Sequence, residues 1–62
     1  MKEYIFEFYA LTSLDDDQIV TAGAKNIEEA EAKAREKAEH MHVSGIKNIW
    51  EIKDSQKIKL TN

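Results

Sequence analysis

Residues 4–11 read YIFEFYAL, and seven of these eight residues are apolar. Successive side chains of a β-strand point to opposite faces, so a strand formed by this stretch has two apolar faces. We define the inner face by Tyr4, Phe6, Phe8 and Ala10, and the outer face by Ile5, Glu7, Tyr9 and Leu11. Two apolar faces need two covering layers, and the fold depends on what the rest of the chain can supply.

The chain has 62 residues, and residues 1–62 are expected to form a single domain. A domain this small buries only about 60% of the surface that its unfolded chain exposes. It has no Cys and only two His, so neither a disulfide nor a metal or other cofactor is expected to supplement the core. Association with a second copy or with a partner remains as a source of further stability.

The N-terminal residues alternate apolar side chains with Lys2, Glu3 and Glu7, and therefore lack the unbroken apolar block of a signal peptide. No stretch approaches the eighteen apolar residues of a membrane span. Without cysteine there is nothing to indicate an oxidising compartment. We expect a protein of the cytoplasm, in the producing or host cell, with no membrane contact.

Charge is distributed unevenly along the chain. Residues 1–42 contain five Lys or Arg against ten Asp or Glu, a balance of −5, and residues 43–62 contain four against two, a balance of +2, which together give the net −3. A protein that binds duplex nucleic acid usually presents a concentrated basic surface. The acidic balance makes nucleic acid the less favoured partner.

A helix is indicated after residue 25. Asn26 precedes Ile27-Glu28-Glu29, a pattern in which the Asn side chain accepts from the backbone N–H of residue 29. One apolar stripe then recurs at spacings of three and four, formed by Ile27, Ala30, Ala34, Ala38 and Met41. Gly45 is the expected stop, in the left-handed conformation that commonly follows a helix.

Strands are expected on both sides of this helix. A five-residue loop over 13–17 places Val20, Ala22 and Ala24 on the inner face. A three-residue loop over 54–56 sets Ile52 against Ile58 and Trp50 against Leu60, all four on the inner face. The expected fold is α+β: a two-layer ββαββ sandwich in which a four-stranded antiparallel sheet of order 2-1-3-4 carries one helix on one face.

One helix covers one face, so the outer face stays open. Five of its apolar residues are expected to be neighbours on adjacent strands: Ile5, Tyr9, Leu11, Ile19 and Ile49. Isolated apolar residues are ordinary on protein surfaces, whereas contiguous patches mark interfaces. We therefore interpret these five residues as a protein interface.

Three further groups of residues bear on possible chemistry. Asp15, Asp16 and Asp17 form an acidic surface at a loop tip without the spacing of a calcium loop, and could engage a basic partner. His40 and His42 are two residues apart on the expected helix and do not face each other, so no metal site is expected. No Ser or Thr has a credible base and no phosphate-binding loop is present, so we expect neither an enzyme nor a small-molecule substrate.

The run Ala22-Gly23-Ala24-Lys25-Asn26-Ile27-Glu28-Glu29-Ala30 leads from a strand through a helix cap into a charged alanine helix. It resembles a pattern in short accessory proteins of phages, prophages and plasmids. Over residues 18–40 it also resembles the N-terminal module of HicB-type antitoxins. The resemblance implies a small accessory protein of a mobile element and identifies no functional residues.

Together these features predict a small non-enzymatic protein-binding module, such as a phage-encoded inhibitor or regulator, that acts through the uncovered sheet face or by forming a homodimer. The alternative is a small nucleic-acid-binding module. It would use Tyr9 as a stacking residue beside a stripe of four lysines on the outer face, Lys47, Lys53, Lys57 and Lys59.

Overall fold

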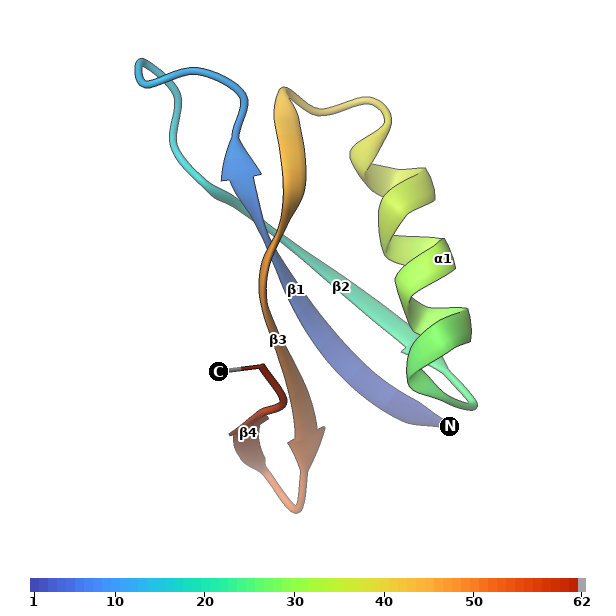
Figure 1. Cartoon of the computed structure of the whole chain (residues 1–62). Helices are drawn as coiled ribbons and strands as arrows, with labels where there is room; N and C mark the ends of the chain where they lie inside the picture. The colour runs from blue at the N-terminus through green and yellow to red at the C-terminus, as the bar shows by residue number, and fades with distance from the viewer. Residues whose placement is uncertain (62) are drawn as a thin grey trace.

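The computed structural model describes residues 1–61 and contains four strands and one helix (Figure 1). Along the chain these are β1 (Lys2–Ala10), β2 (Gln18–Ala24), α1 (Ile27–Ala38), β3 (Val43–Lys53) and β4 (Gln56–Lys59). The strands form one antiparallel sheet in the order β2-β1-β3-β4. This confirms the expected α+β fold and strand order.

The helix begins as its sequence indicates. Asn26 is the N-cap, and its Oδ1 accepts from the backbone N–H of Glu29 at 2.9 Å. The predicted end at Gly45 is wrong, because α1 ends at Ala38 and Gly45 lies inside β3 without a positive φ. The C-cap Glu39 stays right-handed, and its N–H is bonded to the carbonyls of Arg35 and Glu36. These bonds close the last turn, so no left-handed glycine is needed.

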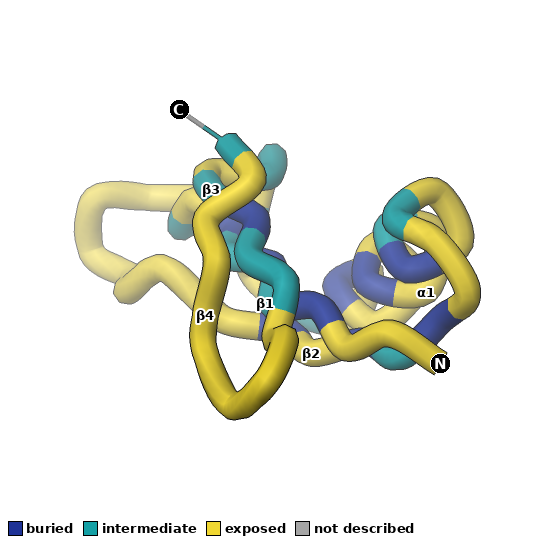
Figure 2. The backbone as a smooth tube through the Cα atoms, turned by 90° about the horizontal axis from the view of Figure 1, so that it is seen from below, coloured by how far each residue is buried: buried dark blue, intermediate teal, exposed yellow. Residues whose placement is uncertain are grey.

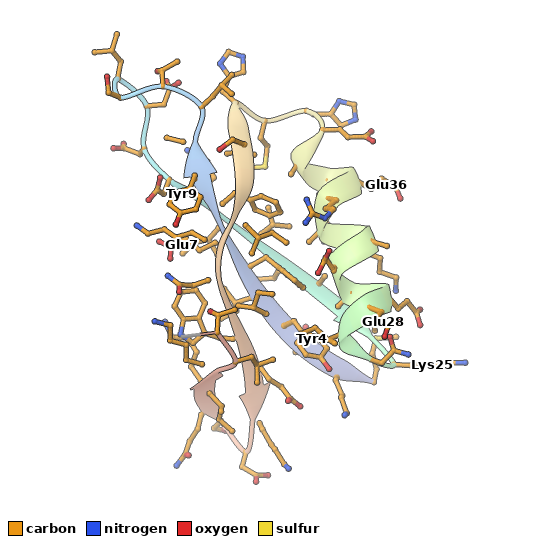
Figure 3. All side chains as sticks on the ribbon, in the orientation of Figure 1. Tyr4, Glu7, Tyr9, Lys25, Glu28 and Glu36 are labelled. Carbon is orange, nitrogen blue, oxygen red and sulfur yellow. The ribbon has the colours of Figure 1, made fainter. Side chains whose placement is uncertain are left out.

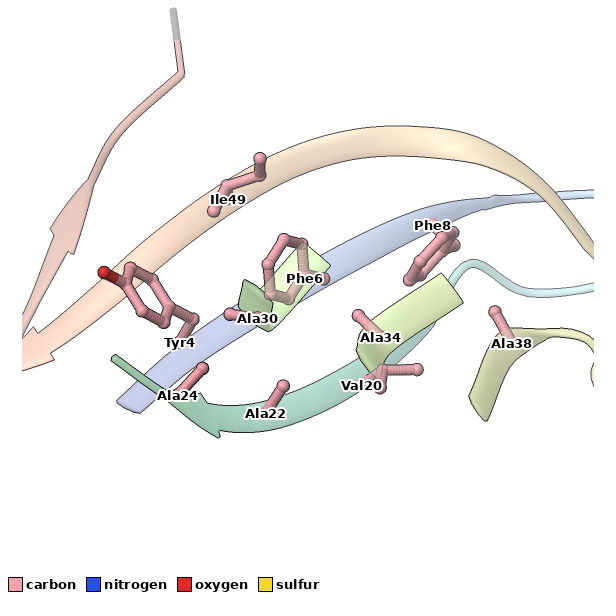
Figure 4. Close-up of a cluster of buried hydrophobic side chains, with 10 residues drawn as sticks. All are labelled: Tyr4, Phe6, Phe8, Val20, Ala22, Ala24, Ala30, Ala34, Ala38 and Ile49. Carbon is pink, nitrogen blue, oxygen red and sulfur yellow. The ribbon is translucent and has the colours of Figure 1, made fainter. Parts of the chain in front are cut away.

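The core lies between α1 and the inner face of β1 and β2 (Figure 4). Its buried apolar residues are Tyr4, Phe6, Phe8, Val20, Ala22, Ala24, Ala30, Ala34, Ala38 and Ile49. Half of them are alanines, which allow the helix to lie close to the sheet while the two phenylalanines fill the layer. The core is correspondingly thin.

The β1–β2 pair keeps the predicted faces but has a different register. Val20, Ala22 and Ala24 are buried, as expected. They lie opposite Phe6, Tyr4 and Lys2. A five-residue loop would pair Val20 with Ala10, so the observed register is shifted by four residues along β1. The connection after Ala10 is longer than predicted and runs from residue 11 to residue 17. A shift by an even number of residues leaves every side chain on its predicted face.

The β1–β3 pair contains two register shifts, between Glu7 and Phe8 and between Phe8 and Ala10. Each places an extra residue in β3, as a β-bulge does. As a result, three apolar residues spaced three apart all lie opposite inner-face residues of β1: Val43, Ile46 and Ile49. The predicted outer position of Ile49 is therefore wrong, since it lies opposite Phe6 and is only 8% exposed.

The same pairing reverses the prediction for the rest of β3. Trp50 lies opposite Ile5 and Ile52 lies opposite Glu3, so both belong to the outer face. The β3–β4 turn is also shorter than predicted, because Lys53 pairs with Gln56 across only Asp54 and Ser55, whose φ angles are 51° and 63°. Positive φ at both central residues is what a two-residue type I′ turn requires.

Helix α1 is displaced toward one side of the sheet. It packs against β2 and, over a smaller area, against β1, and Figure 2 shows it standing well away from β4. Every residue of β4 is exposed. The inner face of β3 and β4 is therefore only partly covered, in addition to the open outer face.

Candidate interaction surface

The outer face of the sheet is organised in rows of residues that lie opposite one another on neighbouring strands. One row runs Gly23, Glu3, Ile52, Lys57, and the next runs Thr21, Ile5, Trp50, Lys59. A third row contains Ile19, Glu7 and Asn48. Figure 3 shows Glu7 and Tyr9 pointing away from α1, on the side opposite to Tyr4.

The apolar members of these rows form one contiguous group, which we call the outer apolar cluster: Ile5, Ile19, Trp50 and Ile52. Ile5 lies directly opposite Trp50 and diagonal to Ile19 and Ile52, within the range at which large side chains on a sheet touch. Ile19 is 61% exposed and Ile52 is 40% exposed, while Ile5 and Trp50 are half-buried. The cluster crosses three strands of the face that the helix does not cover.

Two of the five predicted interface residues, Ile5 and Ile19, belong to this cluster. Tyr9 lies on the same face, beyond Glu7, and is 49% exposed. Leu11 is exposed in the connection that follows β1. Ile49 belongs to the core instead. Sequence reasoning missed Trp50 and Ile52 because a three-residue loop over 54–56 paired them with Ile58 and Leu60 and placed all four on the inner face.

Beyond the cluster, the outer face carries paired polar groups. Lys47 Nζ lies 2.9 Å from Asp17 Oδ2 and 5.8 Å from the centroid of the Tyr9 ring. Asp17 Oδ1 also accepts from the backbone N–H of Ala10 at 2.7 Å. The hydrogen bond from Lys47, followed by that from Ala10, lowers the pKa of Asp17, and the same contact with Asp17 raises the pKa of Lys47. Asn48 Nδ2 donates to Glu7 Oε1 at 3.0 Å.

These contacts separate the three aspartates of the predicted acidic surface. Asp17 is turned toward Lys47, and Asp15 Oδ2 accepts from Thr12 Oγ1 at 2.9 Å. Asp15 and Asp16 line a shallow hollow of about 450 Å³ together with Leu14, Gln18, Met41 and His42. The three carboxylates therefore do not point into a common site.

The four lysines of the predicted basic stripe are also divided. Lys57 and Lys59 lie on the outer face, opposite Ile52 and Trp50, and Lys57 Nζ is 4.7 Å from the centroid of the Trp50 ring. Lys47 is on the same side of the sheet and is paired with Asp17. The predicted outer position of Lys53 is wrong, because it alternates with Ile52 and pairs with Gln56 on the inner side.

A second apolar surface lies on the inner side, where α1 does not reach. Ile58 is opposite Glu51, and the N–H of Leu60 donates to the carbonyl of Ile49 at 2.8 Å, so both residues continue the inner face. They are 42% and 43% exposed. We call Ile58 and Leu60 the inner strip. The sequence analysis predicted that Ile58 and Leu60 lie on this side. It did not predict the displacement of the helix that leaves them exposed.

The free edge of β2 carries side chains that occupy its backbone carbonyls, and the strand at the other edge, β4, is short. Lys33 Nζ donates to the carbonyl of Gly23 at 2.8 Å and Lys37 Nζ donates to the carbonyl of Thr21 at 2.7 Å, which covers the free edge of β2. Beyond the short strand β4, Thr61 Oγ1 accepts from the backbone N–H of Ile49 at 3.1 Å. Occupied and short edges disfavour strand addition, so the faces of the sheet are the more open surfaces.

Within residues 1–61, no group of three His, Asp or Glu side chains is arranged to hold a metal ion. In the same part of the chain, α1 is too short and too polar to cross a membrane. No protein-family model matches the chain, and no curated protein or solved structure is significantly similar to it.

Proposed function

We propose that the protein is a small non-enzymatic binding module that engages a protein partner, either another protein or a second copy of itself, through the outer face of its sheet. The observation that carries this proposal is the outer apolar cluster, in which Trp50 and two exposed isoleucines meet on a face with no covering layer. A half-buried tryptophan surrounded by aliphatic side chains is typical of the energetic centre of an interface. The alanine-rich core adds a reason for association, since a small domain gains stability from a bound partner.

The resemblance over residues 18–40 supports a more specific role. We place the protein among the accessory proteins of phages and other mobile elements, as a cytoplasmic inhibitor or regulator that acts by occupying a surface of its target. Such a role requires binding and no chemistry of its own, which agrees with an outer face of aromatic, aliphatic and charged groups.

The nucleic-acid alternative rests on one observation, the position of Lys57 over the ring of Trp50 near a second lysine, Lys59. Aromatic rings beside lysines are the usual platform for single-stranded nucleic acid. Glu3 and Glu7 share this face and would repel phosphates. A salt-sensitive affinity for a random oligonucleotide would favour this alternative, and the absence of binding at low salt would exclude it.

The protein-binding proposal can be tested with two isoleucines of nearly equal exposure. Ile52 is 40% exposed on the outer face, and Ile58 is 42% exposed on the inner strip one strand away. Replacing each by Gln adds an amide without changing the charge, and an amide buried without a partner weakens an interface by roughly tenfold or more. Wild-type, Ile52→Gln and Ile58→Gln baits would be compared in extracts of the producing cell by quantitative mass spectrometry.

The expected result is that Ile52→Gln loses proteins, including untagged copies of the chain, that the wild type and Ile58→Gln both retain. Circular dichroism of the three baits establishes that each is folded. Loss with Ile58→Gln alone would refute the outer face and assign binding to the inner strip. If no bait enriches any protein, the binding function itself is refuted.

A further inference from the structure

We propose that the partner of the outer face is a second copy of this chain, packed face to face across a two-fold axis that runs along β3. In this arrangement Lys57 of each copy faces Glu3 of the other, and Lys59 lies over Ile5, between Glu3 and Glu7. The inference rests on the proposed function, because it uses the same face, and it adds the identity of the partner and the geometry of the contact.

The argument begins with the positions of charge on either side of β3. Ile52 lies between Glu3 on β1 and Lys57 on β4, directly opposite both. One row further along, Trp50 lies between Ile5 and Lys59. The acidic column of β1 and the basic column of β4 are therefore each one strand away from β3, at a spacing of about 4.8 Å.

A two-fold axis along β3 exchanges these two columns. It leaves each row at the same height and carries β4 of one copy over β1 of the other, so Lys57 comes to face Glu3. Lys59 then lies over Ile5, from which its ammonium can reach the carboxylate of Glu3 or Glu7. Because an interface across a two-fold axis is self-complementary, each contact occurs twice.

Within residues 1–61, none of the four side chains Glu3, Glu7, Lys57 and Lys59 is held in an ion pair of its own chain, and Lys57, whose Nζ lies 4.7 Å from the centroid of the Trp50 ring, would turn from that ring toward Glu3 of the second copy. The ion pairs in this part of the chain join Glu29 to Lys33, Glu31 to Arg35 and Asp17 to Lys47. Glu7 accepts from Asn48 through Oε1, which leaves its other oxygen for a cation. The charged side chains of the outer face that have no ion pair within the chain would thus form ion pairs with the opposite charges of a second copy.

The apolar residues fit the same axis. Trp50 and Ile52 are on β3 itself, so each would meet its own counterpart at the centre of the contact, with Ile5 beside them. Charged residues surrounding a central apolar anchor are the usual anatomy of an interface. Two sheets packed face to face keep their strands within about 30° of each other, as rotation about a strand direction requires. The occupied edge of β2 favours this contact over edge-to-edge pairing.

Charge reversal tests this geometry directly. The acidic variant carries Lys57→Glu and Lys59→Glu, and the basic variant carries Glu3→Lys and Glu7→Lys. Each alone would place like charges opposite one another twice, so each is expected to dimerise at least about 100-fold more weakly than the wild type. A mixture of the two restores both contacts and should form a one-to-one dimer in sedimentation velocity, weakened by added salt.

The control is Lys53→Glu, which makes the same charge change as Lys57→Glu alone, in the same hairpin but on the inner side, and should leave dimerisation unchanged. Because Glu7 also binds Asn48, the single variants Glu3→Lys and Lys57→Glu provide a second mixed pair if the double variant is unfolded by circular dichroism. A wild-type chain that stays monomeric at high concentration would overturn the inference, while Ile52-dependent capture of a different protein would leave the proposed function standing. Reversed variants that still dimerise alone, or that fail to pair when mixed, would overturn the axis.

Discussion

The turn between β3 and β4 decides which residues of β4 share a face with Trp50, and Ser55→Gly probes it. Ser55 has φ 63° and an exposed side chain, so its removal breaks no buried contact. A left-handed conformation costs a residue with a β-carbon about 1–2 kcal/mol, and glycine removes this strain. Glycine also loses more backbone entropy on folding, which offsets about 0.5–1 kcal/mol of that gain. We expect Ser55→Gly to stabilise the fold by about 0.5–1 kcal/mol.

Two measurements follow this change. For a domain of this size, thermal unfolding followed by circular dichroism should shift upward by roughly 2–8 °C. Amide exchange gives a local readout, because the N–H of Leu60 is bonded to the carbonyl of Ile49 and reports on the closed hairpin. Its exchange should slow by roughly two- to fivefold.

Gln56→Gly is the matched control. Gln56 is the first residue of β4 and has no positive φ, so glycine there should cost about 0.5–1 kcal/mol. In a three-residue loop over 54–56 the left-handed residue would be Gln56. Gln56→Gly would then stabilise the fold and Ser55→Gly would not. Stabilisation by Gln56→Gly with none from Ser55→Gly would refute the two-residue turn. It would also remove Lys59 from the outer face, and with it the proposed axis.

Three further predictions concern single residues. Phe8 is fully buried, so Phe8→Ala should lower the free energy of unfolding by about 3 kcal/mol or more, a large part of the stability of so small a domain. Tyr9 is half-exposed, so Tyr9→Lys should lower it by no more than about 1 kcal/mol. Urea titrations measure both changes, and the reverse order would show that Tyr9 lies on the buried face of β1 and Phe8 on the open one. Gly45→Ala should be neutral or raise the unfolding midpoint, because Gly45 has no positive φ and a β-carbon there meets nothing within 4 Å, and a loss of about 1 kcal/mol would contradict its place in β3. The hydrogen bonds that lower the pKa of Asp17 below its ordinary 3.8 stabilise the fold above that pH and are lost as the pH falls through the lowered pKa, so acid titrations of stability should be less steep for Asp17→Asn than for the wild type.

Local chemistry along the chain was enough to predict the fold class and the face of the central strand. The alternation of Tyr4, Phe6 and Phe8 with polar and smaller residues identifies the inner face of β1, and all three are buried. The cap at Asn26 and the alanine spacing define the start and the buried stripe of α1. These features depend on side-chain periodicity and nearby hydrogen bonds, so the sequence alone determines them.

The tertiary structure alone decided which side of β3 meets the helix. Counting along a strand assumes that every residue advances the pleat, and each bulge in β3 adds one residue that exchanges the two faces beyond it. Two bulges bring Val43, Ile46 and Ile49 to the inner side at spacings of three, which does not match the period of two of a regular strand. Trp50 and Ile52 are on the outer face because they pair with Ile5 and Glu3 of β1, and this pairing between strands distant in sequence is decided by the tertiary structure.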